Sequence, residues 1–246
     1  MKNTKKQKAF LFDIDGTLTE SRMSMSADST MAFLSWMIDR DIFLVTGSDI
    51  EKAKQQIPQS ILSRCIGIFS SMGNVYHVND DLVYENRFNI DDDILCEINK
   101  MLCSSQCPEE YRATKHYEYR PGMLNFSFCG RDVTRQQRKQ YNKWDIKHGE
   151  RIRFVEWFNK RFASENLEAC LGGEISIDIQ PVGKDKRQAV KYLVNHGYNE
   201  FVFFGDRAIP GGNDWGVCEY IIENNLGTYY SVDSPKETVA LLSTII

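Results

Sequence analysis

The chain has 246 residues, of which 42% are hydrophobic and 12% aromatic, so it is long enough to fold around one large or two small cores. Its net charge of −4 gives no support to nucleic acid or an anionic membrane as the main partner, and no apolar stretch approaches the length of a membrane span. The seven cysteines include no Cys-x-x-Cys pair, and the basic start runs directly into an apolar segment. We therefore expect free thiols, no signal peptide and a cytoplasmic location.

The first 84 residues predict buried strands that alternate with helices. Continuous apolar runs, such as the one from Ala9 to Phe12, are typical of strands buried on both faces of a parallel sheet. In chain order we expect a strand at 9–12, a helix capped by Ser26 or Asp28 and reaching Ile38, a strand at 41–45, a helix at 50–56, a strand at 66–69 and a hairpin of 74–78 with 82–84.

Two carboxylates follow the first strand, in Asp13-Ile14-Asp15-Gly16-Thr17. Residues two apart on an extended chain point the same way, so we expect Asp13 and Asp15 to converge where Gly16 turns the chain. Close carboxylates repel unless a cation lies between them, and hard oxygen ligands suit Mg²⁺. One carboxylate could then attack a phosphate while the other moves a proton. The alternative is a plain polar turn after a strand.

The second strand ends in two hydroxyl residues, Thr46 and Ser48. Hydroxyls and backbone N–H groups at the start of a helix are natural phosphate ligands, so either residue could hold a phosphate oxygen. A plain helix N-cap by Ser48 or Asp49 explains the same residues equally well.

Residues 85–184 follow a different pattern. A helix at 89–103 and a polar, irregular segment at 107–119 precede two segments with period-two alternation, 123–128 and 175–180. Between them lie a charged segment at 134–147 and a helix at 151–162 with an apolar side. Strands of this kind form an antiparallel sheet with one packed and one open face, so we predict a separate α+β domain.

Buried strands return after residue 184, with a helix that begins at Asp185-Lys186 and a strand at 201–204 that ends in Gly205-Asp206. We therefore predict an α/β core of residues 1–84 and 185–246, interrupted by the inserted domain at 85–184. The carboxyl ends of neighbouring parallel strands meet at one edge of a sheet, so Asp206 should complete the Mg²⁺ site.

Two further charged residues belong to this predicted site. Lys186 would supply positive charge to a transferring phosphoryl group, and Asp214 would orient Lys186 or a water molecule. A rival metal cluster of Cys103, Cys107 and His116 has poor ligand spacing.

These core residues resemble the four motifs of the haloacid-dehalogenase-like (HAD) phosphotransferases, and the inserted domain resembles that of the eukaryotic-type phosphomannomutases. The segments that carry the second resemblance are Arg120-Pro121-Gly122-Met123-Leu124-Asn125, Gly130-Arg131, Gly172-Gly173-Glu174-Ile175-Ser176-Ile177-Asp178 and Pro210-Gly211-Gly212-Asn213-Asp214. The resemblance covers the chain nearly end to end. It implies a Rossmann-like HAD core with a parallel sheet and an inserted, type IIB-like α+β cap.

The resemblance also implies roles for individual residues. Asp13 would be the nucleophile and Asp15 the general acid/base, with the backbone carbonyl of Asp15 on Mg²⁺. Ser176 and Asp178 would meet sugar hydroxyls. Guanidinium groups suit bidentate phosphate binding, although arginines in a charged segment are usually solvated. The residues implied to hold the non-reacting phosphate are Arg22, Arg120, Arg131 and Arg138.

The implied activity is that of a phosphomannomutase, an isomerase that interconverts mannose 6-phosphate and mannose 1-phosphate for GDP-mannose synthesis. The reaction would pass through a phosphoaspartate and a hexose 1,6-bisphosphate, which also serves as activator, and glucose phosphates remain open as substrates. A homodimer through the cap is implied as well. The nearest alternative is a Mg²⁺-dependent HAD sugar phosphatase, in which water takes the phosphoryl group. A non-catalytic sugar-phosphate binding protein is disfavoured because every expected carboxylate is present.

Overall fold

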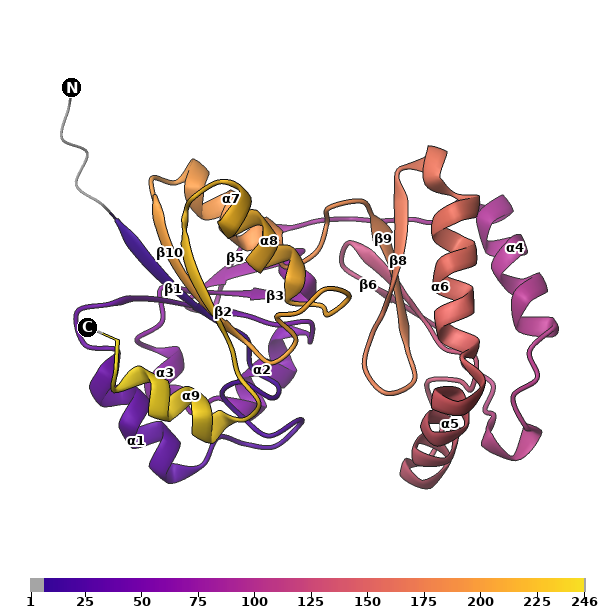
Figure 1. Cartoon of the computed structure of the whole chain (residues 1–246), viewed down its shortest axis with the longest axis horizontal. Helices are drawn as coiled ribbons and strands as arrows, with labels where there is room; N and C mark the ends of the chain where they lie inside the picture. Colours follow the sequence, from indigo (N-terminus) through magenta and orange to yellow (C-terminus); the bar gives the residue numbers. More distant parts are fainter. Residues whose placement is uncertain (1–6, 246) are drawn as a thin grey trace. The chain divides into compact units, whose positions relative to one another are not determined.

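The computed structural model describes residues 7–245, which divide into two compact units (Figure 1). The core unit comprises the described residues up to Glu85 and those from Gly183 onward, and the cap unit comprises Asn86–Val182. Each unit has its own sheet and its own hydrophobic core. The predicted fold class, an α/β core with an inserted α+β domain, is confirmed.

The core unit is organised around a seven-stranded sheet in the order β11-β10-β1-β2-β3-β4-β5. The pairings from β11 to β3 are parallel, whereas β3, β4 and β5 pair antiparallel at one end of the sheet. The strands are β1 (Lys8–Phe12), β2 (Asp41–Val45), β3 (Gly67–Ser70), β4 (Val75–Val78), β5 (Asp81–Glu85), β10 (Glu200–Gly205) and β11 (Gly227–Ser231).

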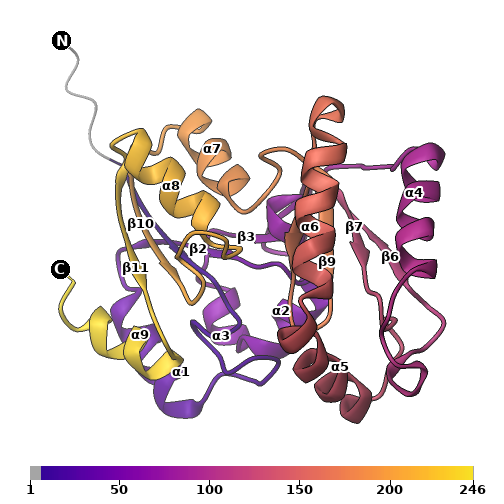
Figure 2. The same ribbon diagram turned by 45° about the vertical axis from the view of Figure 1, so that its right-hand side comes forward.

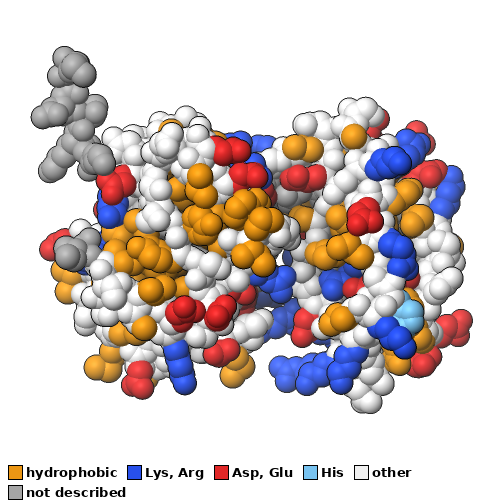
Figure 3. Space-filling view, in the orientation of Figure 1, with side chains coloured by type: hydrophobic (Ala, Val, Ile, Leu, Met, Phe, Trp, Pro, Cys, Tyr) orange, Lys and Arg blue, Asp and Glu red, His pale blue; other side chains and the backbone are white. Residues whose placement is uncertain are grey.

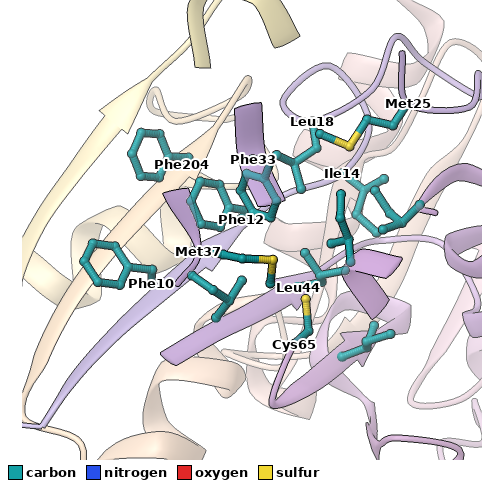
Figure 4. Packing of buried hydrophobic residues seen from close by; sticks show 14 of the residues in the cluster. Phe10, Phe12, Ile14, Leu18, Met25, Phe33, Met37, Leu44, Cys65 and Phe204 are labelled. Carbon is teal, nitrogen blue, oxygen red and sulfur yellow. The ribbon is translucent and has the colours of Figure 1, made fainter. Parts of the chain in front are cut away.

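Helices cover both faces of this sheet (Figure 2). Alternation along β1 sends Phe10 and Phe12 into one apolar cluster and Ala9 and Leu11 into the other, which explains its continuous apolar sequence. Figure 4 shows the first cluster, in which Phe12 stacks on Phe204 of the neighbouring strand. The helices are α1 (Ala27–Trp36), α2 (Ile50–Gln56), α3 (Gln59–Leu62) and α9 (Pro235–Leu242) on the first face, and α7 (Arg187–Asn195) and α8 (Trp215–Glu223) on the second.

Side-chain caps determine where several of these helices begin. Ser26 caps α1 by accepting a hydrogen bond from the N–H of Ser29, and Asp49 caps α2 by accepting one from the N–H of Lys52. The sequence left open whether Ser26 or Asp28 caps the first helix and whether Ser48 or Asp49 caps the second. In the structure, the caps are Ser26 and Asp49.

The cap unit contains a four-stranded antiparallel sheet in the order β6-β7-β9-β8. Leu124, Phe126, Ile177 and Ile179 pack with helix residues such as Phe154 in a single core, so the helices cover one face of this sheet. The elements are β6 (Tyr117–Arg120), β7 (Met123–Phe126), β8 (Leu167–Leu171), β9 (Ile177–Pro181), α4 (Asp92–Cys103), α5 (Arg135–His148) and α6 (Glu150–Arg161). Short 3₁₀ turns are η1 (Ser71–Gly73), η2 (Glu109–Tyr111) and η3 (Ala163–Glu165).

The cap unit departs from the sequence predictions in three places. The segment expected to be irregular ends in β6, whose Tyr-Glu-Tyr-Arg sequence lacks a clear apolar face, and β8 is a further strand without a prediction. The charged segment at 134–147 forms α5, because Thr134 and Gln137 make a capping box and Tyr141 is buried. No helix in the described part of the chain is both long and apolar enough to cross a membrane.

Candidate active site

Three neighbouring strands of the core sheet, β10, β1 and β2, end in polar residues at the same edge. The register places Phe12 beside both Phe204 and Leu44, and the N–H of Asp13 donates to the carbonyl of Phe204 at 2.9 Å. Asp206, Asp13 and Thr46 therefore follow adjacent parallel strands, as the sequence predicts. Asp13 and Thr46 are almost fully buried.

Lys186, just before α7, links two carboxylates of this edge. Its fully buried Nζ donates to Asp13 Oδ1 at 2.5 Å and to Asp214 Oδ1 at 2.7 Å. The second oxygen of Asp214 accepts the N–H of Arg207 at 3.0 Å. The predicted pairing of Asp214 with Lys186 is therefore present, and the lysine charge is held against Asp13.

Asp13, Asp206 and Asp214 form a group of carboxylates whose nearest oxygens all lie within 4.8 Å of one another. Glycines make this approach possible, since a Cβ on Gly16 would lie 2.5 Å from Asp206 Oδ2 and one on Gly205 would lie 2.6 Å from Asp214 Oδ2. Lys186 pairs with Asp13 and Asp214, and Arg207 Nε lies 4.0 Å from Asp206 Oδ2. Three carboxylates thus face two cations, so the ionised group carries excess negative charge. Hard oxygen donors with uncompensated charge fit a divalent cation such as Mg²⁺.

The pKa values follow from this crowding of charge in a buried place. The pKa of Asp13 is raised to about 8, because burial and the carboxylates of Asp214 and Asp206 together outweigh the lowering effect of Lys186. Burial and Asp214 likewise raise the pKa of Asp206. For Lys186, burial alone would lower the pKa, but Asp13 and Asp214 raise it, so the lysine stays charged.

The Asp15 side chain lies elsewhere and is not a member of the carboxylate group. Its Oδ1 accepts the backbone N–H of Arg22 at 2.7 Å and the side-chain Nε2 of Gln56 at 2.8 Å. The expectation that its carboxylate converges with that of Asp13 is therefore not met here, because the chain bends at Ile14, between the two residues, and leaves the extended conformation. Gln56 thus contacts Asp15, and no sequence pattern had pointed to it.

The hydroxyl pair after β2 is ordered by local hydrogen bonds. Thr46 Oγ1 accepts the N–H of Ser48 at 3.1 Å, and the Thr46 carbonyl accepts the N–H of Met72 at 3.0 Å. Thr46 thus lies buried beside the strand end, whereas Ser48 is half-buried. Since Asp49 caps α2, Ser48 is not required for that purpose.

The cap sheet carries a second polar cluster on its open face. Glu118 Oε2 accepts hydrogen bonds from Arg120 at 2.8 Å and from Nε and Nη2 of Arg131 at 3.0 and 2.8 Å. Burial alone would raise the pKa of Glu118, but Arg120 and Arg131 lower it to about 2. The shared carboxylate holds two guanidinium groups side by side in an arrangement suited to an anion. Sequence reasoning had selected the arginines and missed Glu118.

Asp178 lies in the same row of the sheet, opposite Asn125, which in turn is opposite Glu118. Asn125 donates its side-chain N–H to Asp178 Oδ1. Burial raises the pKa of Asp178, and Arg120 opposes that shift. Ser176 is buried near this carboxylate, because a Cβ on Gly172 would lie 2.7 Å from Ser176 Oγ and 3.0 Å from Asp178 Oδ2.

The two remaining predicted arginines lie apart from this cluster. Arg22 belongs to the core unit, is exposed and has a left-handed backbone, with φ of 62°. Arg138 lies on α5 of the cap and is half-buried; burial raises the pKa of the Cys129 thiol, and the charge of Arg138 opposes that shift. Figure 3 shows further Lys and Arg side chains over α5, which include the exposed residues Arg135, Lys139 and Lys143.

In the part of the chain that the structure describes, the carboxylate group of the core unit is the single cluster with metal-ligand geometry. Cys103, Cys107 and His116 do not form one, which agrees with the poor spacing of these residues in the sequence.

Comparison with known proteins identifies the family of this chain. Residues 32–246 match the family model described as eukaryotic phosphomannomutase. The phosphomannomutase of Saccharomyces cerevisiae is 31% identical over an alignment that covers 96% of this chain and 92% of the yeast protein. The phosphomannomutase of Dendrobium officinale is also 31% identical, over an alignment that covers 93% of this chain and 90% of the Dendrobium protein. The chain belongs to the eukaryotic phosphomannomutase family.

Solved structures with a similar fold support the HAD-like architecture. A haloacid dehalogenase-like hydrolase from Bacteroides thetaiotaomicron gives a TM-score of 0.59 at 14% identity and covers 98% of this chain and 100% of its own. An IMP-nucleotidase from Plasmodium falciparum gives a TM-score of 0.61 at 14% identity, and the match covers 97% of this chain and 68% of the nucleotidase chain. The predicted family resemblance is therefore confirmed by sequence, and the HAD-like fold by structure.

Proposed function

We propose that this protein is a phosphomannomutase that transfers a phosphoryl group between positions 1 and 6 of mannose through a phosphoaspartate at Asp13. The observation that carries the proposal is the hydrogen bond from the buried Lys186 to Asp13 within the carboxylate group. A charged lysine at a carboxylate keeps that carboxylate available as a nucleophile and balances the charge of an incoming phosphoryl group.

The first half-reaction uses Asp13 as the nucleophile. A carboxylate oxygen of Asp13 forms a bond to phosphorus of a hexose 1,6-bisphosphate, and the bond from phosphorus to the sugar oxygen breaks. The sugar oxygen takes a proton from Asp15, which acts as the general acid. The reverse sequence returns the phosphoryl group to the other hydroxyl of a hexose monophosphate, with Asp15 as the general base.

Gln56 and the backbone of Arg22 would position Asp15 for this role. Both donate to a single oxygen, Oδ1, so the proton would be carried on Oδ2.

Mg²⁺ would be held by the carboxylates of Asp13 and Asp206 and by the backbone carbonyl of Asp15. When bound, it would neutralise charge on the transferring phosphoryl group. The excess negative charge of the carboxylate group supports this assignment. Asp214 keeps its place as the partner of Lys186.

Cap residues would bind the rest of the substrate. Arg120 and Arg131, aligned by Glu118, would hold the non-reacting phosphate, and Asp178 and Ser176 would meet sugar hydroxyls. Arg138 and Arg22 complete the proposed phosphate ligands, and Thr46 would hold an oxygen of the transferring group. We also propose a homodimer through the cap, a cytoplasmic location and a supply of mannose 1-phosphate for GDP-mannose synthesis.

The test is the fate of mannose 1-phosphate with purified protein and Mg²⁺, with and without glucose 1,6-bisphosphate. Mannose 6-phosphate and free phosphate are followed together. We expect isomer formation that depends on the bisphosphate, with little free phosphate. Free phosphate as the main product, indifferent to the bisphosphate, would instead identify a sugar phosphatase built on the same residues.

A further inference from the structure

Two buried acceptor atoms on the cap sheet lack a hydrogen-bond partner among residues 7–245. They are the side-chain oxygens Oδ1 of Asn125 and Oε1 of Gln180. Their residues are only 1% and 0% exposed. Buried acceptors without a donor destabilise a fold, so each such atom in a native protein needs an explanation.

The direction of both amides is determined by their neighbours. Asn125 donates its Nδ2 to Asp178 Oδ1, and Gln180 donates its Nε2 to Glu168 Oε1 at 3.2 Å. An ionised carboxylate only accepts hydrogen bonds, so reversing either amide would set oxygen against oxygen. The two carbonyl oxygens are therefore the free ends of these side chains.

Both side chains lie on the face of the sheet opposite its hydrophobic core. Asn125 is opposite Asp178, and Gln180, two residues farther along β9, is opposite Glu168 on β8. Residues two apart on a strand share a face, so Asn125, Asp178 and Gln180 face away from the core formed by Leu124 and Ile179. The continuing register places Met123 beside Gln180, and Met123 is opposite Arg120.

The polar groups on this face indicate which kind of ligand could bind there. Carbonyl oxygens need donors, and they repel the oxygens of a phosphate. Arg120 and Arg131 offer donors to a phosphate in the same cluster. A ligand with a phosphate at one end and several hydroxyl groups beyond it satisfies both requirements.

We propose that Asn125 Oδ1 and Gln180 Oε1 accept hydrogen bonds from sugar hydroxyls of the substrate and thereby determine which hydroxyl pattern the enzyme accepts. This inference rests on the proposed function, because it names two specificity-determining residues of that same substrate site. It assigns one role to two atoms that are otherwise unexplained.

The test compares the binding of mannose 1-phosphate with that of its 2-, 3- and 4-deoxy analogues by calorimetry. The wild-type protein should bind at least one analogue about tenfold more weakly than mannose 1-phosphate, the value expected for one unpaired acceptor. Gln180→Met keeps the length of the side chain and removes the acceptor. It should bind mannose 1-phosphate about tenfold more weakly and lose its discrimination against one analogue.

Gln106→Met is the matched control, because it makes the same substitution at an exposed glutamine of the cap unit. This variant should keep the wild-type pattern of discrimination. Thermal unfolding gives an independent check. Gln180→Met should unfold at the wild-type temperature or higher without ligand, because an unpaired buried acceptor is gone.

Asn125→Leu provides a second measurement, and it should lose discrimination against a different deoxy analogue. The proposal is overturned if the wild-type protein binds all three analogues as well as mannose 1-phosphate. It is also overturned if both variants keep the wild-type pattern. Because binding is measured without turnover, a protein that failed the isomerisation assay would still give a decisive result here.

Discussion

The core and cap units present their polar groups in opposite ways. In the core unit, the polar residues Asp206, Asp13 and Thr46 follow three parallel strands that end side by side, and Lys186 links Asp13 to Asp214. In the cap unit, polar residues occupy alternate positions across the middle of an antiparallel sheet, and two acceptors stay without a donor. A carboxylate group with excess negative charge suits a cation and chemistry at a fixed place, whereas unfilled acceptors suit recognition of a hydroxyl-rich ligand.

This contrast separates the expected effects of mutations. Changes in the core site should abolish turnover or destabilise the fold, because its charges depend on one another. Changes on the cap sheet should alter affinity and selectivity while the core chemistry stays intact.

The largest effect is expected for Asp13→Asn, which removes the proposed nucleophile with little change of shape. Mutase turnover should fall by about 10⁴-fold or more, the scale seen when a catalytic nucleophile is lost. Steady-state assays of mannose 6-phosphate formation measure it, and the exposed Asp28→Asn is the control. Turnover within tenfold of wild type would exclude Asp13 as the carrier of the phosphoryl group.

Next is Lys186→Met, which leaves Asp13 and Asp214 buried without their shared cation. The free energy of unfolding should fall by about 3–5 kcal/mol, the usual consequence of breaking a buried ion pair. Urea unfolding measures it, and Lys184→Met, at an exposed position two residues away, should have almost no effect. Equal stability of the two variants would contradict the buried network.

Mg²⁺ should stabilise the protein without any substrate. A cation at one hundred times its dissociation constant adds about 2.7 kcal/mol to the free energy of unfolding, so the melting temperature should rise as Mg²⁺ is added. NaCl at equal ionic strength is the control. Asp206→Asn should remove most of this response; a full response in that variant would place the cation elsewhere.

Arg120→Ala and Arg131→Ala test the cap cluster. Each should raise KM for mannose 1-phosphate about tenfold through loss of a charge-assisted phosphate contact, with a smaller change in kcat. Arg135→Ala, at an exposed position on α5, is the matched control. If all three variants had wild-type KM, the cap arginines would not bind the phosphate.

The smallest expected effect is the contribution of Glu118 to the pH dependence of the free energy of unfolding. The pKa of Glu118 is about 2 in the folded protein and about 4.3 in the unfolded chain. Ionised Glu118 therefore stabilises the fold fully above about pH 4.3, and this stabilisation is lost as the pH falls toward 2. The stability gap between wild type and Glu118→Gln should therefore narrow between about pH 5 and pH 2. A gap that stays constant over this range in urea titrations would show that Glu118 does not pair with the arginines.

Much of this protein can be predicted from its sequence, because the signals are local. Apolar runs determine β1, β2 and β10, and Asp13 and Asp206 come directly after two of them. Since neighbouring parallel strands end at one edge, the positions of these carboxylates follow from the pattern. Period-two alternation likewise indicates the open face that carries Asn125 and Asp178.

Only the tertiary structure decides which polar atoms meet. The chain bends at Ile14, and the Asp15 carboxylate meets Gln56 rather than Asp13; two arginines share the carboxylate of Glu118. The unfilled acceptor of Gln180 becomes evident only once its pairing with Glu168 is known. Sequence periodicity determines the face of a strand, but strand register and loop conformation determine the partner across that face. Those depend on contacts between residues far apart in the chain.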